Sequence, residues 1–358
     1  MAKTKKTIQE KLHNFCFFII LALFSINSLN SWAIEKTNQS HSKRNYISIV
    51  GSSTVYPFTA VIAEKFGRKK NYKTPTVEAT GTGGGFKLFC SGIGYKYPDL
   101  TNASRPIQES EIKHCKENGV TEIAEIKIGY DGIVIANSSR GKNFNLTKKH
   151  IFLALAQKVP QNKKLVDNFY KKWSQIDESL PNIEIKVYGP PPSSGTRDAF
   201  TELAMEEFCI NNATFINEFS DKKIRQKKCH TIRSDGHYVE AGENDNLILQ
   251  KLRNDENALG IFGFSFFEEN KNFIKVAKIN FIEPNFENIV NGQYPVSRPL
   301  FIYFKKQNFS LIDNLEEFVR TVLSSDTIGK DGYLVQKGLI PLSDLELRMM
   351  RDKVLRGL

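Results

Sequence analysis

The sequence contains few of the residues from which common catalytic and metal sites are built. Its six histidines are scattered, and none stands in the order of a known catalytic triad. The GxSxG, HExxH and protein-kinase motifs do not occur. Its five cysteines show no CxxC spacing and no Cys/His ligand spacing, which argues against a zinc site. We therefore predict a protein that is not an enzyme and that needs no metal or other cofactor.

Long apolar runs are also scarce, and the one that stands out lies at the N-terminus. Four lysines within the first eleven residues precede an apolar run over residues 15–26, and Ser31-Trp32-Ala33 fits a small-x-small cleavage site. This order is typical of a secretory signal peptide. We predict that residues 1–33 are cleaved, that residues 34–45 form a flexible lead-in and that the protein is periplasmic. An uncleaved anchor is the alternative, but the run is short for a membrane span.

The composition of the whole sequence limits the number of domains and the kind of ligand. The 358 residues, 40% of them hydrophobic, are enough for two domains with a real core. The net charge of +11 suits an anionic ligand, and because the positive charges are scattered we do not expect nucleic-acid binding. Four cysteines remain after cleavage, which in a secreted chain favours two disulfides. Cys90–Cys115 with Cys209–Cys229 is the simplest of three pairings, and each bond would contribute about 3 kcal/mol.

Strand-like and helix-like segments alternate along the chain, which predicts an α/β fold with mainly parallel pairing. A long β-rich stretch over residues 123–136 looks like a strand that passes from one domain to another, and residues 258–264 could form a second crossover. In such sheets the ligand site lies at the carboxyl ends of the strands. Loops rich in glycine, serine and threonine occupy those positions here.

The segment from Pro190 to Phe200 carries the clearest signal of function. An apolar stretch over residues 183–188 predicts a strand before it, and an amphipathic pattern predicts a helix from Thr196 onward. Ser193 and Ser194 would then stand at a helix N-terminus, where backbone N–H groups lack intrahelical partners. Arg197 in the first turn opposes the helix dipole, and a bound anion would resolve that conflict. The segment therefore predicts an oxyanion site.

Two further strand–loop–helix junctions, residues 51–56 and 81–87, offer the same chemistry, and Ser104-Arg105 lies on a fourth loop. The glycine run is no nucleotide P-loop, because Phe86 and Leu88 replace the glycine and hydroxyl residue that flank the motif's lysine. One such loop alone is more often a helix cap. Several together can hold a desolvated dianion, since each hydrogen bond to a charged ligand contributes roughly 1.5–3 kcal/mol.

In their order and combination these motifs resemble the periplasmic phosphate-binding proteins of high-affinity phosphate ABC transporters. The resemblance runs from about Tyr46 to Lys337 and rests on these segments: GSSTVYP at 51–57, GTGGGFK at 81–87, NASRP at 102–106, SGTRD at 194–198, GHYVEAGEND at 236–245 and YPVSRPL at 294–300. It implies a type II periplasmic binding protein with two lobes, hinge crossover strands and the ligand in the cleft between the lobes. Lobe 1 is expected at residues 46–130 with 266–358, and lobe 2 at 131–265.

The resemblance also implies a ligand, a partner and a set of contacts. It implies a monomer that captures inorganic phosphate and delivers it to a membrane ABC permease. Matching the motifs residue by residue, and adding the charged groups that the loops supply, gives the expected phosphate-binding set: Ser53, Thr54, Val55, Thr82, Gly83, Ser104, Arg105, Asp131, Ser193, Ser194, Gly195, Thr196 and Arg197.

This chain departs from the family at the position that selects phosphate. The best-known members have a carboxylate after the third strand, and this carboxylate accepts the proton of hydrogen phosphate. At the same position this chain has Arg105. An ionised carboxylate accepts a hydrogen bond from that proton and repels sulfate, which carries no proton at neutral pH. Asp131 is the candidate replacement and Asp235 a second one. A turn-forming aspartate before glycine is an equally good interpretation of Asp131.

Three other functions stay open at this point. One is a binding protein for another tetrahedral oxyanion, such as sulfate or molybdate. Another is a secreted hydrolase of phosphate esters, although the chain offers no metal cluster. The weakest is a surface adhesin that would use the basic face.

Overall fold

The computed structural model describes residues 44–69, 72–242 and 244–356. The expected signal peptide and residues 34–43 of the expected lead-in lie outside the described residues. Across the residues that are described, no helix is long and apolar enough to cross a membrane.

One sheet of nine strands organises the described chain, in the order β2-β1-β3-β13-β4-β10-β8-β9, with β11 paired to β4. Its strands are β1 (Ser48–Gly51), β2 (Thr76–Ala79), β3 (Leu100–Ala103), β4 (Ile123–Ser138), β8 (Val187–Gly189), β9 (Tyr238–Glu240), β10 (Leu259–Gly263), β11 (Ile274–Val276) and β13 (Ser297–Lys305). Two short pairs lie apart from it, β5 (Asn145–Leu146) with β12 (Lys278–Ile279) and β6 (Lys158–Gln161) with β7 (Lys164–Asp167).

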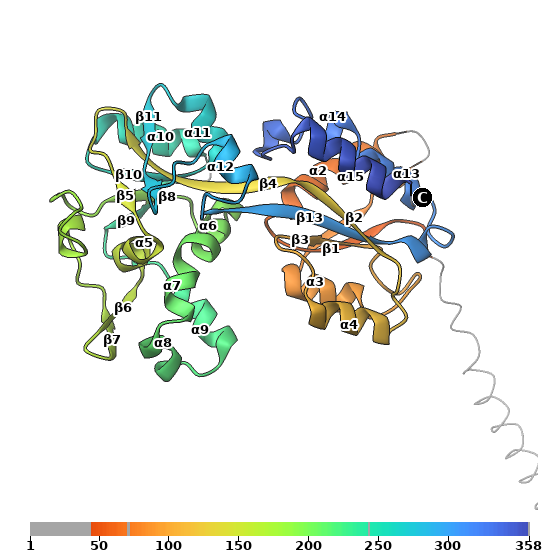
Figure 1. Cartoon of the computed structure of the whole chain (residues 1–358), viewed down its shortest axis with the longest axis horizontal. Coiled ribbons are helices and arrows are strands. Elements are labelled where there is room, and N and C mark those ends of the chain that lie inside the picture. Colours follow the sequence, from red (N-terminus) through yellow and green to blue (C-terminus); the bar gives the residue numbers. More distant parts are fainter. Residues whose placement is uncertain (1–43, 70–71, 243, 357–358) are drawn as a thin grey trace, which may run out of the picture. The chain divides into compact units, whose positions relative to one another are not determined.

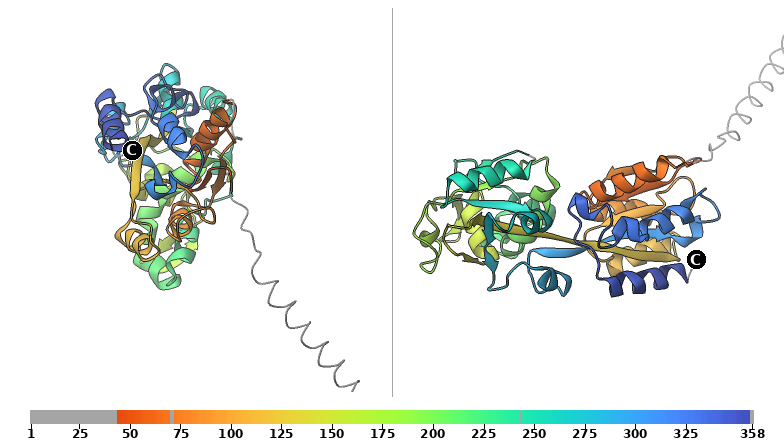
Figure 2. Two further views of the ribbon diagram at one scale, coloured as in Figure 1. Left: turned by 90° about the vertical axis from the view of Figure 1, so that its right-hand side faces the viewer. Right: turned by 90° about the horizontal axis from the view of Figure 1, so that it is seen from above.

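The strand β4 belongs to both halves of this sheet. Its first part, residues 123–132, pairs with β13, and residues 133–137 pair with β10. One group of elements therefore gathers around β1, β2 and β3, and a second around β8, β9 and β10, with β4 and β13 running between them (Figures 1 and 2). The fold is the two-lobed α/β architecture that the resemblance implied.

Helices cover both halves of the sheet. The first lobe contains α2 (Tyr56–Gly67), α3 (Thr82–Phe89), α4 (Glu109–Glu117), α13 (Leu315–Val322), α14 (Ser325–Ile328) and α15 (Asp344–Leu355). The second contains α5 (Lys148–Leu155), α6 (Gly195–Phe200), α7 (Glu206–Ile210), α8 (Ala213–Glu218), α9 (Lys222–Cys229), α10 (Asp245–Asn254), α11 (Phe264–Asn270) and α12 (Phe286–Val290). The helix predicted from Thr196 onward is interrupted, because a π-helical turn, η2 (Thr201–Met205), separates α6 from α7.

Strand pairing differs from the expectation of a mainly parallel sheet. The outer strands pair in parallel, but β4 is antiparallel to β10, β11 and β13, and β13 is antiparallel to β3. The reason is that the central strands are the crossings between the lobes, which run in opposite directions. The chain also returns to the first lobe later than residue 266, since β11 still pairs with β4 at Asn137 and Ser138 and the return is made by β13.

Close backbone approach fixes the loop that follows β1. Gly51 has a φ of 126°, and a Cβ atom there would lie 2.2 Å from the carbonyl oxygen of Asn102. A Cβ atom on Gly85 would lie 2.5 Å from the Cα of Gly51. Only glycine tolerates both constraints, so these two residues bring α3 against the ends of β1 and β3. The first two glycine-rich loops consequently meet.

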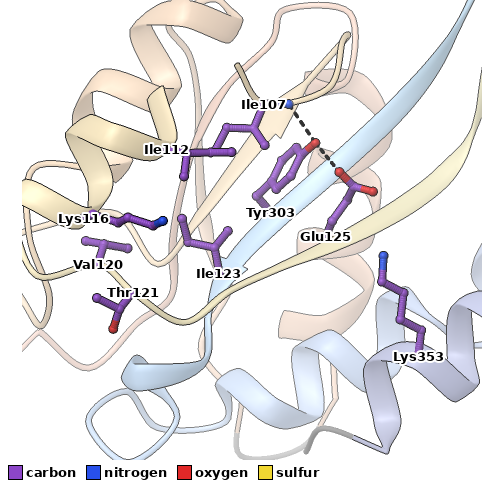
Figure 3. A pocket seen from close by; sticks show the side chains of 9 residues that line it. All are labelled: Ile107, Ile112, Lys116, Val120, Thr121, Ile123, Glu125, Tyr303 and Lys353. Carbon is purple, nitrogen blue, oxygen red and sulfur yellow. Dashed lines mark hydrogen bonds between the residues drawn. The ribbon is translucent and has the colours of Figure 1, made fainter. Parts of the chain in front are cut away.

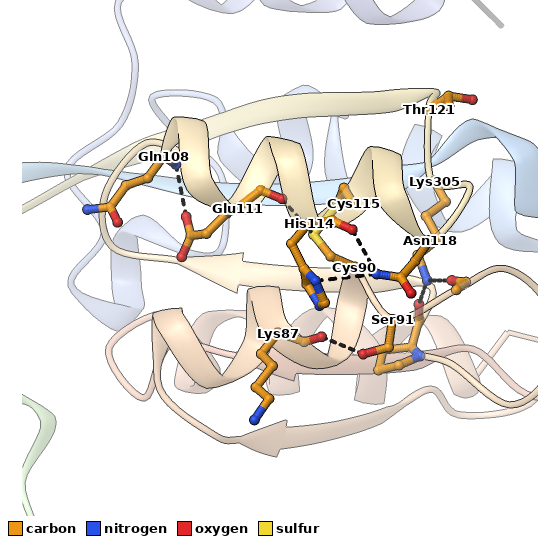
Figure 4. Close-up of a disulfide and its surroundings, with 12 residues drawn as sticks. Lys87, Cys90, Ser91, Gln108, Glu111, His114, Cys115, Asn118, Thr121 and Lys305 are labelled. Carbon is orange, nitrogen blue, oxygen red and sulfur yellow. Dashed lines mark hydrogen bonds between the residues drawn. A yellow bond between two sulfur atoms is a disulfide. The ribbon is translucent and has the colours of Figure 1, made fainter.

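Both expected disulfides are formed. Cys90–Cys115 joins the end of α3 to α4 (Figure 4), and Cys209–Cys229 joins α7 to α9. All four cysteines are buried. Each bond ties helices within one lobe, and neither crosses between the lobes.

Candidate anion-binding site

A cavity of about 250 Å³ lies where the two lobes and β4 meet. Its walls come from six separate parts of the chain: the β1–α2 junction, β4, the start of α6, the start of α10, the β10–α11 junction and the end of η4 (Val335–Lys337) with Gly338. The lining residues are Thr54, Pro57, Phe58, Asp131, Ile133, Gly195, Thr196, Asp245, Gly263, Ser265, Phe266, Lys337 and Gly338.

Four of the thirteen predicted site residues line this cavity: Thr54, Asp131, Gly195 and Thr196. Thr54 lies in the loop between β1 and α2, and Asp131 lies on β4 near one end of its pairing with β13, opposite Arg298. Gly195 and Thr196 form the first turn of α6. The cavity therefore collects a hydroxyl, a carboxylate and a helix start, which are groups that hydrogen-bond a small polar ligand.

Arg298 on β13 provides a largely buried positive charge next to this cavity, in addition to Lys337 in its wall. Its Nη2 donates a hydrogen bond to Thr54 Oγ1 at 2.8 Å, and its Nε lies 3.6 Å from the Asp131 carboxylate. Its Nη1 pairs with Glu202 of the π-helical turn. We call Thr54, Asp131, Glu202 and Arg298 the Arg298 cluster. The side chain of Arg298 is only 10% exposed, so its charge acts in a partly desolvated setting.

Two carboxylates in the cavity wall have altered acidity. Burial raises the pKa of Asp131, and Arg298 opposes that rise while Glu202 adds to it. Burial alone raises the pKa of Asp245, at the start of α10, to about 6. Asp235, the other predicted proton acceptor, is not among the lining residues, since its carboxylate pairs with Arg233. Asp131 and Asp245 are thus the carboxylates in the wall of this cavity.

The loops after β2 and β3 form a cluster of their own. Thr82 Oγ1 and Ser104 Oγ lie 3.1 Å apart, and the Ser104 backbone N–H donates to Thr82 Oγ1 at 3.2 Å. Arg105 makes a two-pronged pair with Glu111 of α4, at 2.9 and 2.8 Å. We call Thr82, Ser104, Arg105 and Glu111 the Arg105 cluster. It does not line the cavity, and the same holds for Gly83, which lies beside the Arg105 side chain.

The remaining predicted residues lie close to the cavity in sequence but do not line it. Val55 is buried and its backbone N–H points to Ser52 Oγ, whereas Ser53 is exposed. Ser194 caps α6 by accepting from the Thr196 N–H at 3.2 Å, and Ser193 precedes it. Arg197 is buried, donates to the Pro190 carbonyl at 3.1 Å and lies over the Tyr238 ring. Their roles as ligand contacts stay predictions.

Sequence reasoning missed Arg298, Asp245 and Lys337. Arg298 is the second residue of strand β13, and its position beside Thr54 follows only from the pairing of β13 with β4. Asp245 follows a helix cap formed by Asn244, which by itself is an ordinary helix start. Arg298 and Asp245 do fall in the 294–300 and 236–245 segments that carry the resemblance, and that was the available signal.

A second hollow, of about 320 Å³, lies on the first lobe among α4, β4, β13 and α15 (Figure 3). Its floor is aliphatic, with Ile107, Ile112, Val120 and Ile123, and Tyr303 donates a hydrogen bond to Glu125 at its side. None of the predicted site residues lines it. The convergence of predicted residues therefore singles out the first cavity.

Comparison with known proteins agrees with this architecture. The family model described as a PBP superfamily domain matches residues 37–326. The chain belongs to this superfamily. Protein SphX of Synechococcus elongatus is 34% identical over 75% of this chain and 71% of its own length. The phosphate-binding protein PstS of Staphylococcus saprophyticus is 30% identical over 76% of this chain and 74% of its own.

Solved structures of superfamily members show the same fold. A possible phosphate binding protein from Planctomyces limnophilus has a TM-score of 0.71 with 29% identity, and the match covers 88% of this chain and 100% of that one. PstS from Borrelia burgdorferi has a TM-score of 0.56 with 19% identity, over 84% of this chain and 100% of that one. The second likeness concerns the fold alone.

Proposed function

We propose that this PBP superfamily member is an extracytoplasmic binding protein that captures inorganic phosphate and passes it to a membrane ABC permease. The observation that carries the proposal is the cavity that brings Thr54, Asp131, Gly195 and Thr196 together beside Arg298. Relatives named as phosphate-binding proteins support the choice of ligand. The function is binding and release, without chemical change of the ligand.

The carboxylates account for a preference among tetrahedral anions. Hydrogen phosphate carries a proton at neutral pH, and an ionised Asp131 or Asp245 can accept it in a hydrogen bond. Sulfate offers no proton, so it would place its negative oxygens against a negative carboxylate with nothing between them. The second acceptor, Asp245, gives the site a means of discrimination even though Arg105 stands where the family usually has its carboxylate.

Calorimetric titration of the purified protein with phosphate, arsenate, sulfate and molybdate tests this proposal. We expect phosphate, and arsenate as its protonated analogue, to bind at micromolar protein, and sulfate and molybdate to bind much more weakly. Absence of phosphate binding would overturn the proposal. Tighter binding of sulfate or molybdate would favour the alternative of another oxyanion, and turnover of a chromogenic phosphomonoester would favour a hydrolase.

A further inference from the structure

We propose that Glu202 is an internal competitor of the ligand, a carboxylate that occupies Arg298 until an incoming oxyanion displaces it. This inference rests on the proposed anion-binding function and adds to it the residue that sets affinity. The structural basis is the single guanidinium of Arg298 shared by Glu202, Thr54 and Asp131.

The first argument is the distribution of donors on Arg298. Nη2 donates to Thr54, and Nε faces Asp131; both partners line the cavity. The third, Nη1, is the one that Glu202 holds. A carboxylate and a phosphate present the same kind of oxygen to a guanidinium, and arginine binds both through its planar fork. Glu202 therefore occupies a place that a ligand oxygen fits.

The second argument is the balance of charge. Asp131, Glu202 and, on α6, Asp198 surround Arg298, and burial together with the field of Glu202 raises the pKa of Asp198. Arg197 also acts on Asp198, but its guanidinium lies over Tyr238. Lys337 is a second cation at the cavity wall, and Asp245 is a further carboxylate there, so four carboxylates face Arg298 and Lys337. An anion that entered beside all of them would be repelled, and departure of Glu202 removes one of these negative charges and frees Nη1 of Arg298.

The third argument is that Glu202 is the member of the Arg298 cluster that can leave. Its side chain is 40% exposed, whereas the Asp131 side chain is 17% exposed, so water screens the pair of Glu202 with Arg298 more strongly and less attraction is lost when Glu202 leaves. It also lies on the π-helical turn, a rare form of helix that is frequently found at functional sites. A small change of that turn would withdraw the carboxylate from Arg298.

The substitution Glu202→Gln tests the proposal, with Glu207→Gln as its matched control. Glu207 lies on α7 and pairs with Lys148, away from the cavity. We expect Glu202→Gln to lower the calorimetric Kd for inorganic phosphate three- to tenfold and Glu207→Gln to leave it unchanged. If Glu202 acts by occupying Arg298, its effect on the Kd should disappear when Arg298 is replaced. The double variant Glu202→Gln with Arg298→Gln should therefore bind phosphate no more tightly than Arg298→Gln alone.

Two results would overturn the inference. If Glu202→Gln weakens phosphate binding, Glu202 positions Arg298 and does not compete. If it changes nothing, the pair is irrelevant to the ligand. Failure of the unmodified protein to bind phosphate would instead contradict the proposed function, so the two failures are distinguishable. Thermal unfolding of each variant without phosphate verifies that the comparison is made between folded proteins.

Discussion

Two arginines lie near the strand ends of this protein, and their surroundings differ in one decisive respect. Arg105 follows β3 on a loop, and Glu111, six residues further on, takes its guanidinium in a two-pronged pair. Arg298 lies within β13, and its partners Thr54, Asp131 and Glu202 come from three elements far away in the sequence. The Arg105 arrangement is local, and the guanidinium is paired by a residue of the neighbouring helix. The Arg298 arrangement depends on the fold, which brings residues that are distant in the sequence to one guanidinium.

This contrast separates stabilisation from binding. In the Arg105 cluster, Glu111 also accepts from the backbone N–H of Gln108 at the start of α4, so the arginine, the helix cap and the Cys90–Cys115 bond reinforce one structural unit. In the Arg298 cluster two of the four members line a cavity. We therefore expect changes around Arg105 to act mainly on the free energy of unfolding, and changes around Arg298 mainly on the affinity for phosphate.

Removal of the disulfide on the Arg105 side should give the largest effect on stability. We expect the double substitution of Cys90→Ser with Cys115→Ser to lower the free energy of unfolding by 3–4 kcal/mol, on the order given by closing a 25-residue loop. Urea unfolding measures this change. The Kd for phosphate should stay within about threefold, because the bond lies between α3 and α4 and not in the cavity wall. Loss of phosphate binding in a folded variant would contradict the division between a stabilising Arg105 region and a binding Arg298 region.

Replacement of the other arginine should give the largest effect on binding. We expect Arg298→Gln to raise the Kd for phosphate about a hundredfold, which corresponds to about 3 kcal/mol. The charge-assisted bonds to the ligand are lost, and Asp131 is left buried without its counter-charge. Calorimetry measures the Kd, with Arg320→Gln as the control because Arg320 pairs with Glu316 on the exposed face of α13. An Arg298→Gln protein that binds phosphate almost normally would show that this region is not the site.

Local pattern predicted more of the fold than of the site. The strand at residues 76–79, the cap of α5 at Thr147 and both disulfides were visible because each depends on neighbouring residues or on simple pairing. The antiparallel crossings and the interruption of the helix after Phe200 could not be predicted from the sequence, because long-range pairing and π-turns leave no periodic signal. The Arg298 cluster belongs to the same class of feature, because no spacing in the sequence links Thr54 to Arg298.

Asp245 offers a third test, in which stability and binding should move in opposite directions. Its folded pKa of about 6 lies above the value near 3.9 of an unfolded aspartate, so the native state binds more protons between those values. Stability should therefore fall as the pH rises from about 4 to 6 and then level off. Asp245→Asn should remove that fall and stabilise the ligand-free protein at pH 7 by about 3 kcal/mol, the shift of about two pKa units converted to free energy.

The same substitution should weaken discrimination between ligands. An amide can donate a hydrogen bond to sulfate, whereas the carboxylate cannot, so the ratio of the sulfate and phosphate Kd values should move toward one. Urea unfolding across pH 4–8 and paired titrations measure the two effects. If the stability profile of Asp245→Asn matches that of the unmodified protein, Asp245 is not the group that titrates, and the choice between anions then depends on Asp131.

The smallest effect on binding is expected at Arg105 itself. Arg105→Gln removes the pair with Glu111 and should lower the free energy of unfolding by about 1 kcal/mol, since the side chain is partly exposed and its pair is screened by water. Glu111→Gln should cost a similar amount, and the double variant should cost less than the sum because both members of one pair are removed. The Kd for phosphate should change less than threefold in each. A loss of binding at Arg105 that matched the loss at Arg298 would mean that Glu111 releases its partner to the ligand, and the two arginines would then share the role that the structure divides between them.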